Sequence, residues 1–219
     1  IDSLPKVNVN FILTNPSELI RLTYKEKSYT LKLRFKQQIS EKHSSFILTT
    51  LTNYGKFVSD ENGKLRRYLF DSNIRDYQKH STVNKDILET LRNPIEDTDF
   101  WWFNNGVTIL TKRGSIESGN IIELDDVQII NGLQTTNVVY EYLNETKDER
   151  FKDKDERLIG IKIITTSNPK IRDGLIKSTN FQNPITATSL RASDHIQYNI
   201  ESYFLNNGWY YDRRKNYYK

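Results

Sequence analysis

The stretch from residue 107 to residue 130 limits the fold more strongly than any other region of the chain. Val107, Ile109 and Thr111 alternate with their neighbours as the residues of a half-buried strand do, and the segment 121–130 is again extended. The residues between them, 114–120, are rich in glycine and small polar residues that are typical of turns. We therefore predict that the two extended segments form a β-hairpin.

A glycine turn and a helix follow this hairpin. Gly132 permits a tight turn, Thr135 and Thr136 are suited to a helix start, and an apolar helical face then runs through Val138, Val139, Tyr142 and Leu143. The apolar segment 158–164 predicts a buried strand, and Pro169 a further helix start. We expect the strand before Asn131 and the strand 158–164 to pair in a parallel β-α-β crossover.

The remaining segments complete a mixed pattern. Alternation predicts strands at 7–13, 29–35 and 46–51, and helical spacing predicts helices at 84–91 and about 189–205, the last ending at Asn206-Asn207-Gly208. The charged run 147–157 is interpreted as solvated. The fold class expected is α+β, a mixed sheet with helices. It is divided into a β-rich lead-in (1–60) and a core domain (61–219) within one continuous globular unit.

Composition excludes several classes of protein. With 36% hydrophobic and 12% aromatic residues the chain is expected to fold, and no apolar run approaches the length of a membrane helix. The absence of cysteine removes thiol chemistry and disulfides and fits a cytoplasmic location. The absence of methionine, with a start at Ile1, predicts a fragment of a longer protein. A net charge of +4 permits a nucleic-acid partner without requiring one.

Familiar catalytic signatures are missing, so whether the chain is an enzyme stays open and no cofactor is predicted. One nuclease-like spacing exists, in which Asp125 or Asp126 precedes Glu145 and Lys147 by about twenty residues. Such carboxylates could hold Mg²⁺ while the lysine polarises a phosphate. Because Glu145 lies at the charged end of a predicted helix, a Mg²⁺-dependent nuclease is kept as an alternative, and no metal ligand is assigned.

Neutral amides beside glycines form the richest candidate site. Amide side chains carry donors and acceptors, and a glycine turn that opens a helix presents free N–H groups to an anion. The alternative interpretation is that asparagine and glycine are simply favoured in turns. The predicted ligand-binding residues are Asn104, Asn105, Gly106, Asn131, Gly132, Gln134, Thr135, Asn180, Gln182 and Arg75.

Aromatic and basic residues interleave near the end of the sequence. Ring stacking combined with phosphate neutralisation is what binding of single-stranded nucleic acid requires. The predicted nucleic-acid contacts are Tyr211, Arg213, Arg214 and Lys215. Consecutive aromatic residues can also be half core, which is the interpretation given to the run 100–103.

Five motifs in order resemble the abortive infection phage resistance family, known as AIPR. They are LFDSNIRDY (69–77), FWWFNNGVTI (100–109), QIINGLQT (128–135), NFQNP (180–184) and YYDRR (210–214). The resemblance implies a bacterial protein of anti-phage defence. In many members a nuclease-like segment precedes this domain, and such a segment is absent from this sequence.

The order strand, glycine turn, helix, strand, helix in the C-terminal half is also similar to ParB-like and DndB-like domains. In those domains the glycine turn lies at a nucleotide or DNA phosphate. Leu133 and Gln134 stand here where the ParB arrangement has an arginine pair, and an arginine is missing near Asn183. The similarity therefore implies a ligand less charged than a triphosphate, unless Arg75 and Arg191 supply the cations.

These observations favour a ligand-sensing, nucleotide-binding or nucleic-acid-binding domain of an anti-phage defence protein. The alternative from another class is a protein-interaction module that recognises a phage component through aromatic residues, with the amides serving turns and core contacts. The two hypotheses differ in whether the amide side chains converge on an open cleft or on one another.

Overall fold

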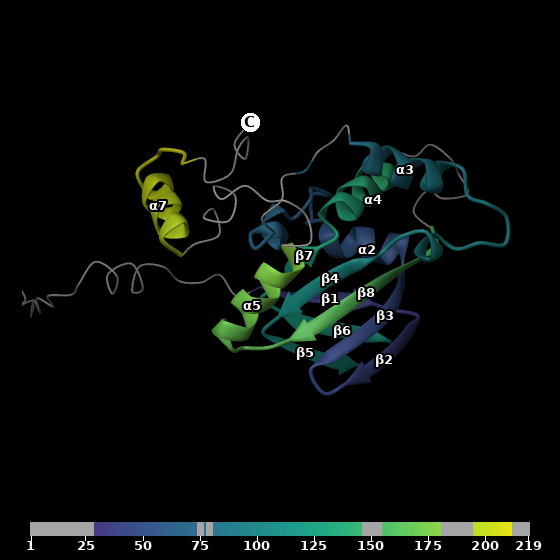
Figure 1. Ribbon diagram of the computed structural model, residues 1–219, viewed down its shortest axis with the longest axis horizontal. Helices are drawn as coiled ribbons and strands as arrows, with labels where there is room; N and C mark the ends of the chain where they lie inside the picture. The colour runs from purple at the N-terminus through teal and green to yellow at the C-terminus, as the bar shows by residue number, and fades with distance from the viewer. Residues whose placement is uncertain (1–28, 74–76, 78–80, 146–154, 181–194, 212–219) are drawn as a thin grey trace, which may run out of the picture.

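The computed structural model describes residues 29–73, 77, 81–145, 155–180 and 195–211. These residues form two β-sheets (Figure 1). The three-stranded sheet has the order β1-β6-β5 and the five-stranded sheet the order β2-β3-β8-β4-β7. The strands are β1 (Thr30–Arg34), β2 (Gln37–Glu41), β3 (Ser44–Thr50), β4 (Val107–Thr111), β5 (Arg113–Glu117), β6 (Ile121–Asp125), β7 (Gln128–Asn131) and β8 (Leu158–Thr165).

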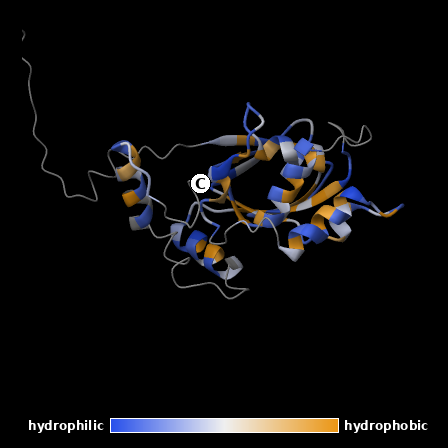
Figure 2. Ribbon diagram, turned by 90° about the horizontal axis from the view of Figure 1, so that it is seen from above, coloured by the Kyte–Doolittle hydropathy of each residue, from blue (hydrophilic) through white to orange (hydrophobic). Residues whose placement is uncertain are grey.

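Helices α2, α3 and α4 lie together above the strands in Figure 1, α5 lies beside β7, and α7 stands apart from the sheets. Seen from above, the helices carry hydrophobic residues on one side and hydrophilic residues on the other (Figure 2), as amphipathic helices do. The helices are α2 (Leu51–Val58), α3 (Thr82–Arg92), α4 (Leu133–Glu145), α5 (Pro169–Asn180) and α7 (His195–Asn206), with short 3₁₀ turns η1 (Arg67–Phe70) and η2 (Phe100–Trp102).

Local sequence explains where two helices begin. The Thr50 side chain accepts a hydrogen bond from the Asn53 amide, and Ser81 accepts one from Asn84, so both are N-caps. At the other end of the chain, α7 finishes at Asn206 and Gly208 follows with a φ of 75°. This glycine confirms the predicted end of the last helix.

One core joins the two sheets and the helices. It contains residues from both sheets, such as Leu33, Ile47 and Ile161, together with Tyr54 of α2 and Val139 of α4. Alternation in β1 places Leu33 inside and leaves Lys32 and Arg34 exposed, as its sequence pattern predicts. The described residues before position 60 thus contribute to the same core as those after it. The division at residue 60 remains a prediction.

The α+β class and the mixed sheet are confirmed. β8 pairs in parallel with β4 and antiparallel with β3. The strands predicted at 29–35 and 46–51 correspond to β1 and β3, although β1 is one residue shorter at each end and Leu51 begins α2; β2 and α2 were not foreseen. The helix predicted at 84–91 is α3. The strand predicted at 7–13 and the residues 189–194 lie outside the described residues.

The predicted hairpin is wrong in one respect. Residues 114–117 of the segment interpreted as turn belong to strand β5, which pairs with β6 in the small sheet, while β4 pairs with β7. The extended segment 121–130 is divided at Asp126, whose φ of 52° redirects the chain. A hairpin is therefore inserted between two strands that are neighbours in the large sheet.

The predicted parallel pairing of β7 with β8 is also wrong. β4 lies between them and runs antiparallel to β7. The elements follow one another as expected, as strand, glycine turn, helix, strand and helix. However, the sequence shows only that order, and it does not show that an earlier strand is inserted between two later ones.

Candidate functional site

Two glycine loops meet at one end of the large sheet. Asn131 at the end of β7 is the register partner of Thr108 near the start of β4, so the loop 104–106 lies beside the turn at Gly132. Gly106 and Gly132 have φ values of 71° and 98°. A Cβ atom on Gly132 would lie 3.1 Å from the carbonyl oxygen of Gly106. Only glycine allows both the conformation and this approach of backbones.

The asparagine side chains of these loops form hydrogen bonds with the backbone of the same loops. Asn104 Oδ1 accepts a hydrogen bond from the backbone N–H of Gly106 at 2.8 Å, and Asn131 Oδ1 accepts one from Gly132 at the same distance. Asn104 also lies 3.4 Å from the hydroxyl of Thr135 in the first turn of α4. These hydrogen bonds run within the loops and to the start of α4. The structure thus brings together five of the predicted residues: Asn104, Gly106, Asn131, Gly132 and Thr135.

A buried chain of hydrogen bonds connects the turn at Gly132 to helix α2. The Tyr54 hydroxyl lies 2.7 Å from Thr136 Oγ1, which donates to the carbonyl oxygen of Gly132 at 2.8 Å. Burial raises the pKa of Tyr54 well above its ordinary value, and the bond to Thr136 opposes that rise. Sequence reasoning missed Tyr54 because helix α2 was not predicted. The only signal was the pair of threonines after the glycine.

The other predicted ligand-binding residues include two from the same loop and helix start. Gln134 is half-buried in the first turn of α4, and Asn105 is exposed. Asn180 is the last residue of α5. Arg75 and Gln182 lie outside the described residues. A ligand-binding role for these residues stays a prediction.

The position of the glycine turn in the sheet differs from the expectation. The turn was expected at the carboxyl ends of parallel strands, where ligands of α/β proteins usually bind. The parallel pair is β4 with β8, and β7 runs against β4, so Gly132 lies where β4 begins. Gly132 therefore lies at the opposite end of the parallel strand pair from the strand ends at which α/β proteins usually bind ligands.

The two aspartates of the nuclease-like spacing are engaged in ion pairs. Asp125 accepts from Arg113 Nε at 2.8 Å and Asp126 lies 2.9 Å from Lys112 Nζ. Glu145 is exposed at the end of α4, and Lys147 lies outside the described residues. Among the residues that the structure describes, no three acidic or histidine side chains are grouped closely enough to hold a metal ion.

The aromatic residues after α7 divide into two kinds. Tyr211 is half-buried, because its ring stacks on Phe204 with centroids 5.8 Å apart and its hydroxyl donates to Gln197 at 2.6 Å. Trp209 and Tyr210 are 68% and 73% exposed. Arg213, Arg214 and Lys215 follow directly in sequence but lie outside the described residues.

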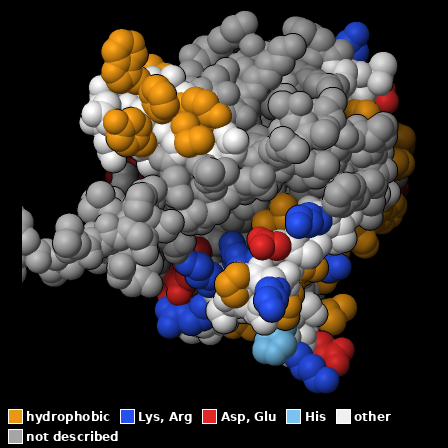
Figure 3. Space-filling model, turned by 60° about the vertical axis from the view of Figure 1, so that its left-hand side comes forward, with side chains coloured by type: hydrophobic (Ala, Val, Ile, Leu, Met, Phe, Trp, Pro, Cys, Tyr) orange, Lys and Arg blue, Asp and Glu red, His pale blue; other side chains and the backbone are white. Residues whose placement is uncertain are grey.

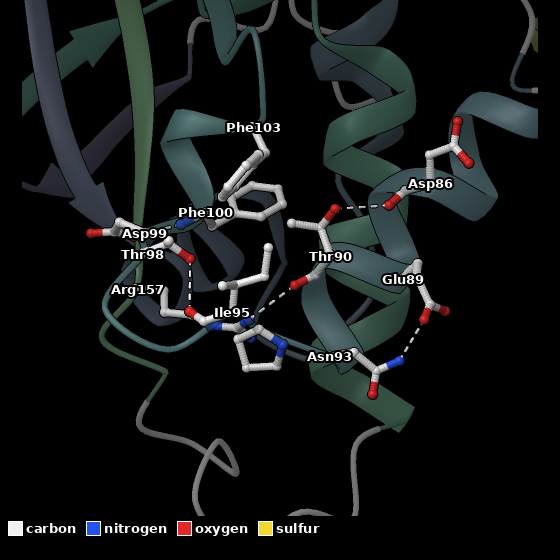
Figure 4. Close-up of a pocket in the computed structure, with 11 residues that line it drawn as sticks. Asp86, Glu89, Thr90, Asn93, Ile95, Thr98, Asp99, Phe100, Phe103 and Arg157 are labelled. Atoms are coloured by element: carbon white, nitrogen blue, oxygen red, sulfur yellow. Dashed lines mark hydrogen bonds between the residues drawn. The ribbon is translucent and has the colours of Figure 1, made fainter.

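A cavity of about 310 Å³ lies elsewhere, between α3, the loop after it and η2 (Figure 4). Its lining includes Asp86 and Glu89 of α3, Ile95 and Phe103, and Arg157 before β8. The motif 100–109 supplies Phe100 and Phe103 to the lining, but the other lining residues come from separate segments, so the sequence did not indicate a cavity.

The aromatic run at this cavity corrects a further expectation. Phe100 is buried in the core, but Trp101, Trp102 and Phe103 are exposed. A 3₁₀ turn causes the difference, since consecutive residues of a turn point in different directions and only one of the four rings reaches the core.

Comparison with known proteins gives one match. The model of the AIPR protein family matches residues 70–219, which is more than half of the chain. The chain belongs to the AIPR family. No curated protein and no solved structure matches it.

Membership of the AIPR family confirms the resemblance and implies a domain of abortive-infection, anti-phage defence. The AIPR match includes both glycine loops, the cavity and α7. The match begins at residue 70, so it leaves out β3, although β3 lies between β2 and β8 in the large sheet. None of the described helices combines the length and hydrophobicity that a membrane-spanning segment needs.

Proposed function

We propose that this AIPR domain binds single-stranded nucleic acid through the exposed aromatic side chains on and after α7, together with the basic residues that follow. The single observation that carries the proposal is the exposure of Tyr203, Trp209 and Tyr210, which are 67%, 68% and 73% accessible. In Figure 3 hydrophobic side chains gather on the surface of α7. We call Tyr203, Trp209 and Tyr210 the α7 aromatic surface.

The exposed rings of the α7 aromatic surface offer flat faces on which bases can stack. A base stacked on an aromatic side chain contributes roughly 1–3 kcal/mol, and every base offers a flat face. The sequence places three basic residues within four residues of Tyr211: Arg213, Arg214 and Lys215. Their positive charges can neutralise the phosphate groups of a nucleic-acid strand whose bases stack on the rings.

In this proposal Tyr211 has a supporting role instead of the stacking role expected from the sequence. Its ring and hydroxyl face α7 through Phe204 and Gln197, so it supports the segment that carries Trp209 and Tyr210. Stacking is therefore assigned to its neighbours, while the three basic residues keep the phosphate-binding role predicted from the sequence.

The test is a titration of labelled single-stranded and double-stranded oligonucleotides, followed by fluorescence anisotropy at two salt concentrations. We expect tighter binding to single strands and a loss of affinity as salt rises. Trp209→Ala with Tyr210→Ala should weaken binding by tenfold or more, since about 1.4 kcal/mol corresponds to tenfold. Trp102→Ala is the matched control, because it removes an exposed tryptophan on another surface.

Two results would count against the proposal. One is the absence of binding at low salt, and the other is equal affinity in the wild type and in the Arg213→Ala, Arg214→Ala variant. Either result would favour the protein-interaction alternative for the α7 aromatic surface. Incubation of the same oligonucleotides with Mg²⁺ tests the nuclease alternative separately, because cleavage would be lost in Asp126→Ala and Glu145→Ala.

A further inference from the structure

A second exposed apolar surface lies at the cavity between α3 and η2. Ile95, Trp102 and Phe103 are 65%, 58% and 54% exposed, and Trp101 is beside them in the same turn. We call these four residues the η2 surface. Ile95 and Phe103 also line the cavity, so the η2 surface continues into a hollow rather than lying flat.

We propose that the cavity and the η2 surface bind a short basic segment of a partner protein, with one apolar side chain inserted in the cavity and lysine or arginine residues beside it. A volume of about 310 Å³ is at the lower end of ligand pockets, which run from about 300 to 1,000 Å³. It suits one anchoring side chain better than an extended ligand.

The interior of the cavity explains the apolar anchor. Pro94, Ile95, Phe100 and Phe103 contribute apolar atoms, and in Figure 4 the Ile95 side chain and the two phenyl rings lie between the polar residues of α3 and Arg157. The polar groups there are already bonded to their surroundings: Thr98 donates to Ile95 O at 2.7 Å and Thr90 to Asp86 O at 2.9 Å. An apolar side chain therefore enters without displacing these bonds.

The charge at the cavity explains the basic flanks. Asp86 and Glu89 on α3 line it, and both are exposed. Glu96 and Asp97, in the loop that follows, add two exposed carboxylates beside the lining. A lysine or arginine of the partner can pair with these carboxylates and stack on the exposed rings.

An anionic partner is disfavoured at the same place. Arg157 is the one cation among the described lining residues. Its guanidinium already donates hydrogen bonds to Asp155, the Tyr142 hydroxyl and the carbonyl oxygen of Leu91. Lys85 and Arg92 are on α3 but do not line the cavity. The charge is thus opposite to that of the basic segment after α7, so the two surfaces suit different partners.

The three tryptophans of the chain allow both surfaces to be followed in one spectrum. Trp101 and Trp102 belong to the η2 surface and Trp209 to the α7 aromatic surface. Their indole N–H signals in ¹⁵N-labelled protein can be assigned with single Trp→Phe variants. The probes are heptapeptides with a central leucine or phenylalanine flanked by lysines, and the same peptides with glutamate flanks.

We expect the lysine-flanked peptides to shift the Trp101 and Trp102 signals saturably while the Trp209 signal stays in place. Asp86→Asn with Glu89→Gln should weaken that binding roughly three- to tenfold, as expected for loss of two exposed charge pairs. Glu41→Gln removes an exposed carboxylate on β2, away from the cavity, and as the control it should bind as the wild type does.

Four results would overturn the proposal. The first is that no peptide shifts these signals, and the second is that glutamate-flanked peptides bind equally well. The third is that an oligonucleotide shifts Trp102, which would make the η2 surface a nucleic-acid site. The fourth is a shift that depends on protein concentration alone, which would identify a second copy of the chain as the occupant. Trp209 reports on the α7 aromatic surface in the same spectrum, and the oligonucleotide titration is a separate measurement, so failure of one proposal is distinguishable from failure of the other.

Discussion

The guanidinium of Arg157 lies against the carboxylate of Asp155, with Nη2 at 2.7 Å from Oδ2 and Nε at 3.0 Å from Oδ1. The Asp155 side chain is completely buried. The same guanidinium donates to the carbonyl oxygen of Leu91 at 2.9 Å and to the Tyr142 hydroxyl at 3.1 Å. One side chain therefore links the ends of α3 and α4 to the start of β8 and completes the wall of the cavity.

Removal of either partner of this pair should be strongly destabilising. Arg157→Met leaves a buried carboxylate without its cation and frees the last carbonyl groups of α3, and loss of one member of a buried ion pair costs about 3–5 kcal/mol. Urea unfolding followed by circular dichroism measures the change in the free energy of unfolding.

Glu156 provides the control from the adjacent position. It forms an exposed ion pair with Lys36 at 2.9 Å, so Glu156→Gln should change stability by no more than about 0.5 kcal/mol. The double variant Asp155→Asn, Arg157→Met should lose less than the sum of the single variants, because it leaves no unpaired charge. Additive losses would show that the pair acts only through packing.

This ion pair also shows where the sequence misleads. Asp155 and Arg157 close a charged run that was interpreted as solvated, and no local pattern separates them from the exposed Glu156 between them. Their burial depends on α3 and α4, which pack against this segment from distant regions of the chain. Charge patterns report local composition, whereas burial of a charge is decided by tertiary partners.

A second prediction concerns Tyr54 at alkaline pH. Because burial raises its pKa above the ordinary value of 10, the folded state resists ionisation more than the unfolded state does. The contribution of this group is complete below pH 10 and is lost as the pH rises above it, at roughly 1.4 kcal/mol per pH unit. Urea midpoints measured between pH 8 and pH 11 should show this loss in the wild type.

Tyr54→Phe should remove this component of the alkaline loss. At neutral pH it should cost about 1 kcal/mol, because the hydrogen bond to Thr136 is lost while the bond from Thr136 to Gly132 remains. Tyr140→Phe is the control, since it removes a tyrosine hydroxyl bonded to Gly63 and leaves Tyr54 in place. If the wild type and Tyr54→Phe lose stability in parallel above pH 10, the assigned role of Tyr54 is wrong.

The order of elements could be predicted from the sequence because it depends on local periodicity and caps. The positions of the glycine loops were also partly predictable, since a hairpin-like pairing of β4 with the segment before Asn131 brings Gly106 near Gly132. What could not be predicted was the insertion of the β5-β6 hairpin and the place of β3 beside β8. These depend on long-range pairing, on which local patterns carry no information. The cavity was missed for the same reason.

The third prediction tests whether the glycine loops are fixed by backbone contact. In Gly106→Ala the new methyl group would overlap the carbonyl oxygen of Gly160 at a left-handed φ, and in Gly132→Ala it would lie 2.8 Å from a methyl group of Val107. Both variants should lose about 3 kcal/mol or more of the free energy of unfolding, since strained backbone and overlap add.

Two other glycines separate these causes. Gly63 has a φ of 74° but open space around it, so Gly63→Ala should lose only about 1 kcal/mol. Gly174, in α5, has neither constraint, and Gly174→Ala should stabilise the protein by about 0.5–1 kcal/mol because alanine favours a helix. Thermal and urea unfolding of the four variants gives the series. If Gly106→Ala and Gly63→Ala lose the same free energy of unfolding, the backbone near Gly160 can shift to remove the overlap at little cost. The glycine loops would then be less rigid than their hydrogen bonds indicate. Losses in the predicted order would instead mean that the loops reach their positions without a ligand, so any ligand there would meet a preformed surface.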